Sequence, residues 1–316
     1  MIEAKIIADS LGPFGDRITS YVLTFPRIVL AEFNTHRALS RNSASSRAIP
    51  APKMLKMVQE NPFIPLRWMK EHTGMQGTEY FTNQQEISNL IKKWLRARNK
   101  AMQLAGAMMD DGVTKQITNR LLEPFMWHTC IATATEWENF FALRAHPDAE
   151  IHIQALANKM LEEANKSTPK TLKPYEWHIP FGENIDTRKL FDLGAGKWWP
   201  GFEDTYETEL EYDADPESFY QTYLVPAMRK IATARCARVS YLNFEGKDDY
   251  EADIKLYDRL LASGHMSPFE HCARAMSQDE YVDNSDWSGN FRGFIQLRKE
   301  LPNENKKDER LIKRTT

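Results

Sequence analysis

Hydrophobic and polar residues recur along this chain with two different periods, one typical of strands and one typical of helices. Near the N-terminus, residues 4–8, 19–25 and 27–33 are apolar runs containing β-branched and aromatic side chains. Gly12, Pro13 and Gly15 mark a turn between the first two runs. This pattern predicts three strands near the N-terminus.

Elsewhere apolar residues follow the 3.6-residue period of an amphipathic helix. The longest such segment covers 85–109, and Gly264 follows the last one in the position of a helix-ending residue. The period predicts helices at residues 85–109, 136–144, 149–164, 216–234 and 250–263. Strands followed by helices, without regular alternation, indicate an α+β fold with a mostly antiparallel sheet flanked by long helices.

Residues 170–218 differ from the rest of the chain because Pro, Gly and Trp are frequent there. The part 202–218 contains eight acidic residues and no basic residue. We therefore expect one domain over 1–316 with an irregular insertion at about 170–218 and a polar tail that frays from Pro302 onward.

Composition indicates an ordinary soluble enzyme. The 316 residues are 42 % hydrophobic and 27 % charged, with a net charge of −3 that draws the chain to neither nucleic acid nor lipid. No apolar run reaches the length of a membrane span, and the first residues lack a signal-peptide layout, so we expect a cytoplasmic protein. Three scattered cysteines (Cys130, Cys236 and Cys272) without a CxxC pair indicate a reducing compartment and no metal site.

The segment 35–47, which follows the third predicted strand, is unusually rich in hydrogen-bond donors. It reads Thr-His-Arg-Ala-Leu-Ser-Arg-Asn-Ser-Ala-Ser-Ser-Arg, with three arginines and four serines in thirteen residues. A planar guanidinium binds phosphate through two parallel hydrogen bonds, and hydroxyl groups satisfy the remaining oxygens. The composition therefore favours an anion-binding site, although a solvated loop is the alternative.

This segment resembles the signature of flavin-dependent thymidylate synthases, the thymidylate synthase complementing protein family. His36, Arg37 and Ser45 occupy signature positions, and Ser40, Asn42 and Arg47 also match. The first signature arginine is Thr35 here, and a usual glutamate is Ser43. The resemblance is strong for the family and weaker for identical chemistry.

Two further parts of the chain extend the resemblance. Residues 138–153 are similar to the family's Asn-Phe-x-x-Leu-Arg run and the helix that follows it, with Glu150 in place of the usual Gln. Residues 238–241 and 264–271 are similar to its Arg-Val-Ser and Gly-His-x-Ser-Pro-Phe-Glu-His elements. In the family these last elements precede the arginine-rich signature, whereas here they follow it, which indicates a circularly permuted member.

The resemblance implies an enzyme that transfers a methyl group to C5 of a pyrimidine deoxynucleotide, forming dTMP from dUMP. FAD would be the cofactor, and NADPH and methylenetetrahydrofolate the co-substrates. It also implies a homotetramer with sites shared between subunits. The absence of a GxGxxG motif argues against a Rossmann mode of FAD binding.

The same resemblance implies roles for individual residues. The catalytic group is His36, Arg37 and His265. The cofactor-binding group is His36, Arg37, Asn42, Asn139, Arg144, His265, Ser267 and Glu270. The substrate-binding group is Ser45, Ser46, Arg47, Gln296 and Arg298. His271 fits equally well as a buried structural histidine, and His72, His128, His152 and His178 are expected to be structural.

The departures from the family pattern leave the substrate open. Arginines of the family correspond to Thr35, Thr135 and Glu162 here, and losing charged hydrogen bonds costs roughly 1.5–3 kcal/mol each. Either another arginine replaces them (Arg235, Arg238, Arg274, Arg292 or Arg298) or the nucleotide differs. Methylation or hydroxymethylation of dCMP is one alternative, because a carboxylate near the base favours an amino group. A non-catalytic nucleotide- or nucleic-acid-binding protein is the alternative of another class.

Overall fold

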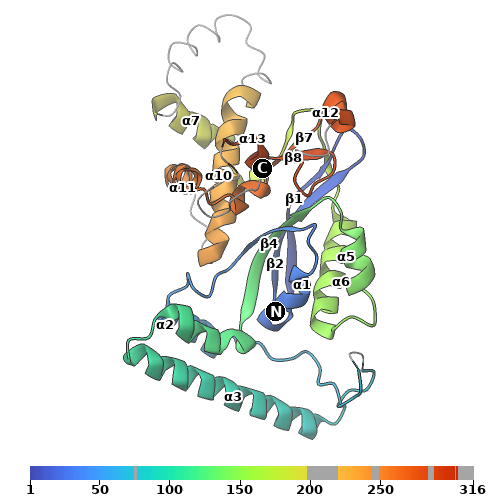
Figure 1. Ribbon diagram of the computed structural model, residues 1–316, viewed down its shortest axis with the longest axis vertical. Helices are drawn as coiled ribbons and strands as arrows, with labels where there is room; N and C mark the ends of the chain where they lie inside the picture. The colour runs from blue at the N-terminus through green and yellow to red at the C-terminus, as the bar shows by residue number, and fades with distance from the viewer. Residues whose placement is uncertain (75–76, 198–219, 243–248, 284–287, 303, 305–316) are drawn as a thin grey trace, which may run out of the picture. The chain divides into compact units, whose positions relative to one another are not determined.

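A computed structural model describes residues 1–74, 77–197, 220–242, 249–283, 288–302 and 304 (Figure 1). The chain divides into two compact units. Unit 1 contains Met1–Ile6, Thr19–Thr168 and Arg238–Glu245, and unit 2 contains Ile7–Ile18, Pro169–Ala237 and Gly246–Thr316. No helix in these described ranges is long and apolar enough to cross a membrane.

The sheet of unit 1 is antiparallel and has β4 (Trp127–Ala134) at its centre, between β3 (Ser40–Ser43) and β2 (Arg17–Pro26). In β2, Tyr21, Leu23 and Phe25 are buried on one face, as the alternation of a strand predicts. β1 (Glu3–Leu11) neighbours β2 on its other side. The strands predicted at 4–8 and 19–25 are therefore confirmed, and β4 was not predicted.

The strand predicted at 27–33 is wrong, because this segment is helical. It forms a 3₁₀ turn η1 (Arg27–Val29) and a short helix α1 (Leu30–Asn34). Val29 and Phe33 are buried four residues apart, whereas Ile28 is 41 % exposed, which is the period of a helix. The buried side chains reach the core only when the segment coils directly after Pro26.

Helices α5 (Glu138–Arg144) and α6 (Ile151–Lys166) cover one face of this sheet and confirm two predicted helices. Their apolar residues join those of β2 and β4 in one core, including Phe140, Leu156 and Met160. Glu150 caps α6, since its carboxylate accepts hydrogen bonds from the backbone N–H groups of His152 (2.8 Å) and Ile153 (3.2 Å).

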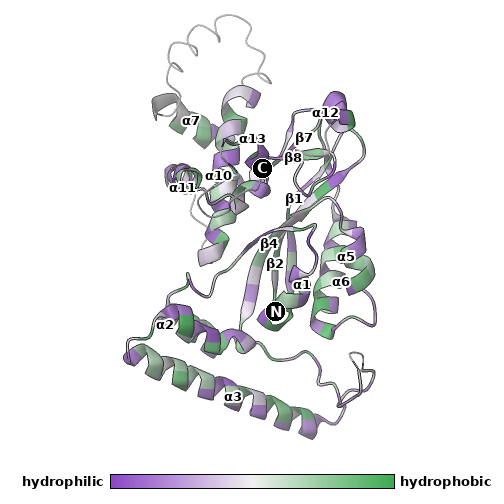
Figure 2. Ribbon diagram, in the orientation of Figure 1, coloured by the Kyte–Doolittle hydropathy of each residue, from purple (hydrophilic) through white to green (hydrophobic). Residues whose placement is uncertain are grey.

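The long helix predicted at 85–109 is also confirmed as α3 (Gln84–Asp110). It begins at Asn83, whose side chain accepts hydrogen bonds from two backbone N–H groups of the first turn. Hydrophobic and hydrophilic residues alternate around α3 in Figure 2, as expected of an amphipathic helix. A second core joins α3 to α2 (Ala51–Glu60) and to the 3₁₀ segment η2 (Asn119–Phe125), which continues the one-turn helix α4 (Lys115–Thr118).

Unit 2 contains short strands. The outer end of β1 pairs in parallel with β5 (Lys170–Thr171), and a second sheet has the order β6 (Trp177–His178), β7 (Ala273–Ala275), β8 (Phe294–Gln296). The turn after β1 is confirmed, because the Gly12 N–H donates to the Asp16 carbonyl at 2.8 Å. Gly15 has φ +89°, a conformation that glycine adopts without strain.

The helices of unit 2 begin with a short turn η3 (Gly182–Asn184) and α7 (Thr187–Lys197). A π-helical turn η4 (Tyr220–Leu224) then leads into α10 (Val225–Arg238). The turn η5 (Val239–Tyr241), which follows α10 in the chain, belongs to unit 1. The next helix is α11 (Tyr250–Ser263). Three short elements follow it in the chain: η6 (Ser267–Glu270), α12 (Gln278–Asp283) and α13 (Leu297–Glu300).

Several predictions for unit 2 can be compared with these elements. The helix predicted at 250–263 is confirmed, and Gly264 ends it with φ 72°. The helix predicted at 216–234 is confirmed from Tyr220 onward, and 216–219 lie outside the described residues. The irregular stretch predicted at 170–218 is wrong for α7, and 198–218 lie outside the described residues, as does the tail except Pro302 and Glu304. The α+β class with a mostly antiparallel sheet is confirmed.

Candidate functional site

His36 lies at the centre of a cluster of arginines in unit 1, between α1 and β3. Arg144, the last residue of α5, donates from Nε to His36 Nε2 at 3.0 Å and from Nη2 to Thr35 Oγ1 at 3.3 Å. Arg41 donates from Nη1 to the carbonyls of Phe33 (3.3 Å) and His36 (3.2 Å). The structure thus brings His36 and Arg144 into contact although 108 positions separate them in the chain.

This environment keeps His36 neutral. Burial lowers its pKa first, and the positive charges of Arg144 and Arg41 lower it further. Because Nε2 accepts the hydrogen bond from Arg144, the ring hydrogen of the neutral form lies on Nδ1. The ring also contacts Phe140 edge to face at a centroid distance of 4.9 Å, which fixes its orientation.

The other predicted residues of unit 1 differ in exposure. Arg37 and Arg47 are exposed, and in the described part of the chain neither guanidinium has a recorded protein partner. Ser45 is half-buried, and its N–H donates to the carbonyl of Ser240 at 3.2 Å. Asn42 is buried and Asn139 is exposed on α5. Two free guanidiniums on one segment are available to an anionic ligand.

Ser46 is buried rather than open to solvent. Its hydroxyl donates to Glu123 Oε1 at 3.0 Å, and its carbonyl accepts from Asn119 Nδ2 at 2.6 Å. Sequence reasoning missed Glu123, Asn119 and Lys115, which support this segment, and it also missed Arg41. The four-residue spacing of Lys115, Asn119 and Glu123 was the available signal, because it places all three on one helical face.

The remaining predicted site residues lie in unit 2. Glu270 and Arg298 form an ion pair of 2.6 Å, and Arg298 also contacts Glu304 at 2.8 Å. Gln296 is buried and donates to Asn290 Oδ1 at 2.7 Å. His265 and Ser267 are exposed, and His265 Nδ1 lies 2.9 Å from Ser263 Oγ.

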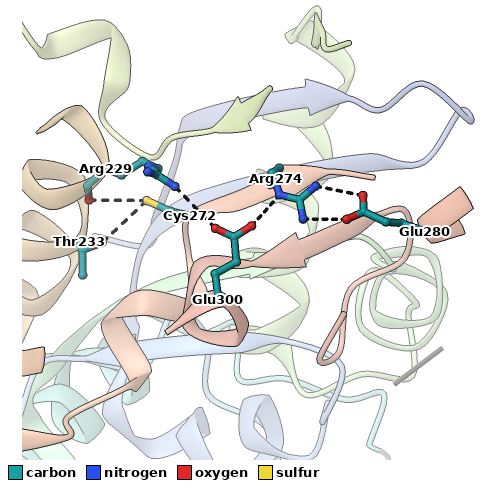
Figure 3. Close-up of polar contacts among 6 residues, drawn as sticks. All are labelled: Arg229, Thr233, Cys272, Arg274, Glu280 and Glu300. Carbon is teal, nitrogen blue, oxygen red and sulfur yellow. Dashed lines mark hydrogen bonds and ion pairs between the residues drawn. The ribbon is translucent and has the colours of Figure 1, made fainter. Parts of the chain in front are cut away.

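Five arginines were considered as replacements for the family arginines missing at Thr35, Thr135 and Glu162. Most of the five form ion pairs with carboxylates of unit 2. Arg274 contacts Glu280 through two nitrogens (2.9 and 3.0 Å) and Glu300 through Nε at 2.6 Å (Figure 3). Buried Arg235 lies 3.6 Å from Asp253. Arg298 is paired as described, and Arg238 and Arg292 make further interactions of their own.

The cysteines and buried histidines have no reactive geometry. Cys272 lies 3.9 Å from Thr233 Oγ1 (Figure 3), and burial raises its pKa to about 12, so the thiol stays protonated. Cys130 and Cys236 are also buried and unbridged. Burial lowers the pKa of His128, His178 and His271 to about 3. Among the described residues, no group of three or more His, Cys, Asp or Glu side chains could hold a metal ion.

Unit 2 also contains a cavity of about 740 Å³ beside β5 and β6. Its lining includes Lys170, Lys173, Trp177 and Tyr220, and none of the predicted site residues of unit 2. Positive and negative side chains are mixed around it, since Asp9, Glu176 and Glu183 also contribute to the lining. The cavity therefore does not define one class of ligand.

Comparison with known proteins covers the part of the chain that holds the site in unit 1. Residues 17–170 match the family model described as Thymidylate synthase complementing protein. The matched residues hold the signature segment and Arg144 and form a little under half of the chain. No curated protein sequence matches the chain.

Two solved structures are similar to part of the chain. Both are the UMP/dUMP methylase PolB from Streptomyces cacaoi at 15 % identity, covering 52 % of this chain. The form bound with 5-Br UMP has a TM-score of 0.44 and is covered to 89 %, and the form bound with 5-Br dUMP has a TM-score of 0.42 and is covered to 91 %. Similarity at this level assigns no residue of this chain a role.

Proposed function

We propose that this protein is a flavin-dependent enzyme that methylates C5 of a pyrimidine deoxynucleotide monophosphate, converting dUMP to dTMP. The observation that carries the proposal is the cationic cluster inside the family-matched segment. There Arg37 and Arg47 are exposed, with no recorded carboxylate partner among the described residues, beside a neutral His36. Such a cluster suits ligands that are anionic or rich in electrons.

The nucleotide would bind along the segment that ends at Arg47. Arg47 would hold the phosphate through its planar fork, and Ser45 would donate to a phosphate or sugar oxygen. Arg144 would replace the cation that the family has at position 35, because its guanidinium donates directly to Thr35 and His36.

FAD fits the chemistry of the donors in unit 1, since exposed cations and amides can hold its phosphates and the polar edge of its ring. His36, Arg37, Asn42, Asn139 and Arg144 would hold it there. When bound and reduced by NADPH, FAD supplies the hydride, and methylenetetrahydrofolate supplies the carbon. Neutral His36 would orient an electron-rich ring through Nδ1–H, and Arg37 would stabilise negative charge on that ring.

Absorption spectroscopy followed by an activity assay tests this function. Purified protein incubated with FAD should show a bound flavin band, and addition of NADPH, methylenetetrahydrofolate and dUMP should form dTMP, measured by mass spectrometry. His36→Ala should reduce turnover strongly while the protein stays folded, and exposed Arg96→Ala on α3 is the matched control. If the purified protein binds no flavin after FAD is added, the proposed enzyme function is wrong and the non-catalytic nucleotide-binding alternative is favoured.

Parallel assays with dCMP decide between the substrate alternatives. The alternative substrate dCMP was considered because Glu162 stands where the family has an arginine. Glu162 is exposed on α6 and pairs with Lys166 at 2.6 Å. A paired, solvated carboxylate gives little discrimination between an amino group and a carbonyl. We therefore expect turnover of dUMP, and turnover of dCMP alone would contradict this choice.

We further propose that the chain carries the sequence elements of the family in permuted order. The contact between Ser45 and Ser240 supports this, because it joins the signature segment to the Arg-Val-Ser element within unit 1. A variant chain that joins Thr316 to Met1 through a linker and opens between Thr168 and Pro169 restores the usual order. It should fold and bind FAD, and a folded permutant without FAD binding would contradict the proposal.

A homotetramer with shared sites is the proposed assembly. Exposed Asn139 and Arg37 in unit 1 are consistent with ligand contacts completed by a second subunit. Analytical ultracentrifugation at assay concentration should give the mass of four chains, and a fully active monomer would contradict shared sites.

A further inference from the structure

The segment 45–49, which carries Arg47, is held by three side chains of α4 and η2. Lys115 Nζ donates to the Ala48 carbonyl at 2.9 Å. Asn119 Nδ2 donates to the carbonyls of Ser46 at 2.6 Å and Ile49 at 3.0 Å. Glu123 accepts from the Ser46 hydroxyl at 3.0 Å. We call Lys115, Asn119 and Glu123 the loop clamp, since every contact of the set lies in unit 1 and reaches the residues flanking Arg47.

Water does not reach Asn119, the central residue of the clamp, so water cannot take over its hydrogen bonds. Asn119 is only 1 % exposed, so its amide is the partner of two backbone carbonyls in a dry environment. The segment adds its own turn, because the N–H groups of Ala48 and Ile49 donate to the Ser45 carbonyl at 3.0 and 3.1 Å. The backbone is therefore fixed on both sides of Arg47, while the Arg47 side chain itself stays exposed.

Glu123 is in turn fixed to the sheet. Arg27 Nη2 donates to Glu123 at 3.3 Å, and Arg27 Nη1 donates to His128 Nδ1 on β4 at 3.0 Å. His128 can accept this bond because burial first, and then Arg27, lower its pKa to about 3 and keep it neutral. Contacts thus run without interruption from β4 through Arg27 and Glu123 to Ser46.

We propose that Lys115, Asn119 and Glu123 are positioning residues that hold residues 46–49 so that Arg47 presents its guanidinium to the phosphate of the nucleotide. Ser46 then acts through Glu123 and does not bind the ligand. This inference rests on the proposed function, in which Arg47 binds that phosphate. A preorganised backbone reduces the ordering cost of binding, so loss of the clamp affects affinity more than chemistry.

Two variants test the clamp with little risk to folding. Lys115→Met removes one donor from an exposed side chain, and Glu123→Met removes the acceptor of Ser46 at similar volume. In each, amide hydrogen exchange of residues 46–49 should accelerate without any ligand, and the KM for dUMP should rise about tenfold with kcat little changed. Glu123→Gln, which keeps an oxygen acceptor, should restore most of the affinity, and exposed Lys92→Met on α3 is the matched control.

The outcomes separate the clamp from the proposed function. Unchanged amide exchange in folded Lys115→Met and Glu123→Met overturns the clamp, whatever the ligand. Faster exchange with an unchanged KM, in a protein that Arg47→Ala impairs, shows a purely structural role and also overturns it. Wild-type protein that binds no dUMP by calorimetry overturns the proposed function itself, and the ligand role of the clamp with it.

Discussion

The exposed arginines of the signature segment in unit 1 differ from two arginines of unit 2 that are paired with carboxylates. In unit 1, Arg37 and Arg47 are exposed without a recorded partner among the described residues. In unit 2, Arg274 is held between Glu280 and Glu300, and Arg298 lies between Glu270 and Glu304. An arginine that already binds two carboxylates has no free edge for phosphate, so the two units use the same residue type for different purposes.

This difference shows that arginine content alone does not locate a ligand site. The free arginines lie on the segment that matches the family model, and the paired ones hold short elements such as β7, α12 and α13 together. Unit 2 also buries His178 and His271 as neutral rings. Its stability should therefore depend on ionisation, whereas unit 1 should use its free charges for binding.

Among the tests of this comparison, acidification should have the largest effect, and the quantity that it changes is the stability of the two units. The folded pKa values of His178 and His271 are about 3, against an ordinary 6.5, so below pH 6.5 the unfolded chain binds protons that the folded chain does not. Stability is therefore lost as the pH falls from 6.5 toward 3, by up to about 2 kcal/mol per histidine at about pH 5. Hydrogen-exchange protection should decrease more in unit 2 than in unit 1, where His128 behaves in the same way. Equal losses in both units would contradict the distinction.

Arg47→Ala should weaken nucleotide binding with no loss of stability. Losing a charged hydrogen bond to phosphate costs roughly 1.5–3 kcal/mol, which corresponds to a Kd about ten- to a hundredfold higher. An exposed position changes the free energy of unfolding by no more than about 0.5 kcal/mol. Calorimetry with dUMP and thermal unfolding measure the two effects. Unchanged affinity would refute the role of Arg47.

Arg274→Ala should do the opposite, with lower stability and no direct effect on nucleotide affinity. Hydrogen bonds from Arg274 lower the pKa of Glu280. Removing the guanidinium takes away the ion-pair partner of part-buried Glu280 and leaves Glu300 with the more distant Arg229 at 3.7 Å. We expect a loss of about 2 kcal/mol, less than for a fully buried pair because solvent reaches both acids. Denaturant unfolding measures it, with exposed Arg259→Ala on α11 as the control. A loss as small as that of the control would show that the pairs are not stabilising.

Glu162→Gln should have the smallest effect. The carboxylate is fully exposed, and its partner Lys166 lies one helical turn away on the surface. Neither the melting temperature nor the ratio of dUMP to dCMP turnover should change. A shift of that ratio toward dUMP would show that Glu162 contacts the base and would revive dCMP as the substrate.

Periodicity predicted the helices well where one face is apolar and the ends are marked. The segment 250–263 forms α11, which Gly264 caps at its C-terminal end. The segment 85–109 forms α3 with one more residue at each end. It failed for Trp127–Ala134, which is buried almost throughout and so shows no alternation. It also failed for residues 27–33, where an apolar run too short to show its period formed η1 and α1.

Some features of the candidate site could likewise be predicted from the sequence and others could not. The donor-rich residues 35–47 were visible in the sequence because their types and spacing are local. The contacts of the clamp were not visible, because they join Ser46 to Asn119 across 73 positions and to Glu123 across 77. Nor could the sequence reveal that Ser46 is buried while its neighbour Arg47 is exposed.

The sequence by itself determined which donors are present, the period of the long helices and the resemblance of 35–47 to a known signature. Only the tertiary structure decided which arginines remain free. Arg144 meets His36 across 108 positions, and Arg274 meets Glu300 across 26. Whether a guanidinium is neutralised depends on which carboxylates the fold brings within hydrogen-bond distance, and that is a property of packing and not of neighbouring residues in the chain.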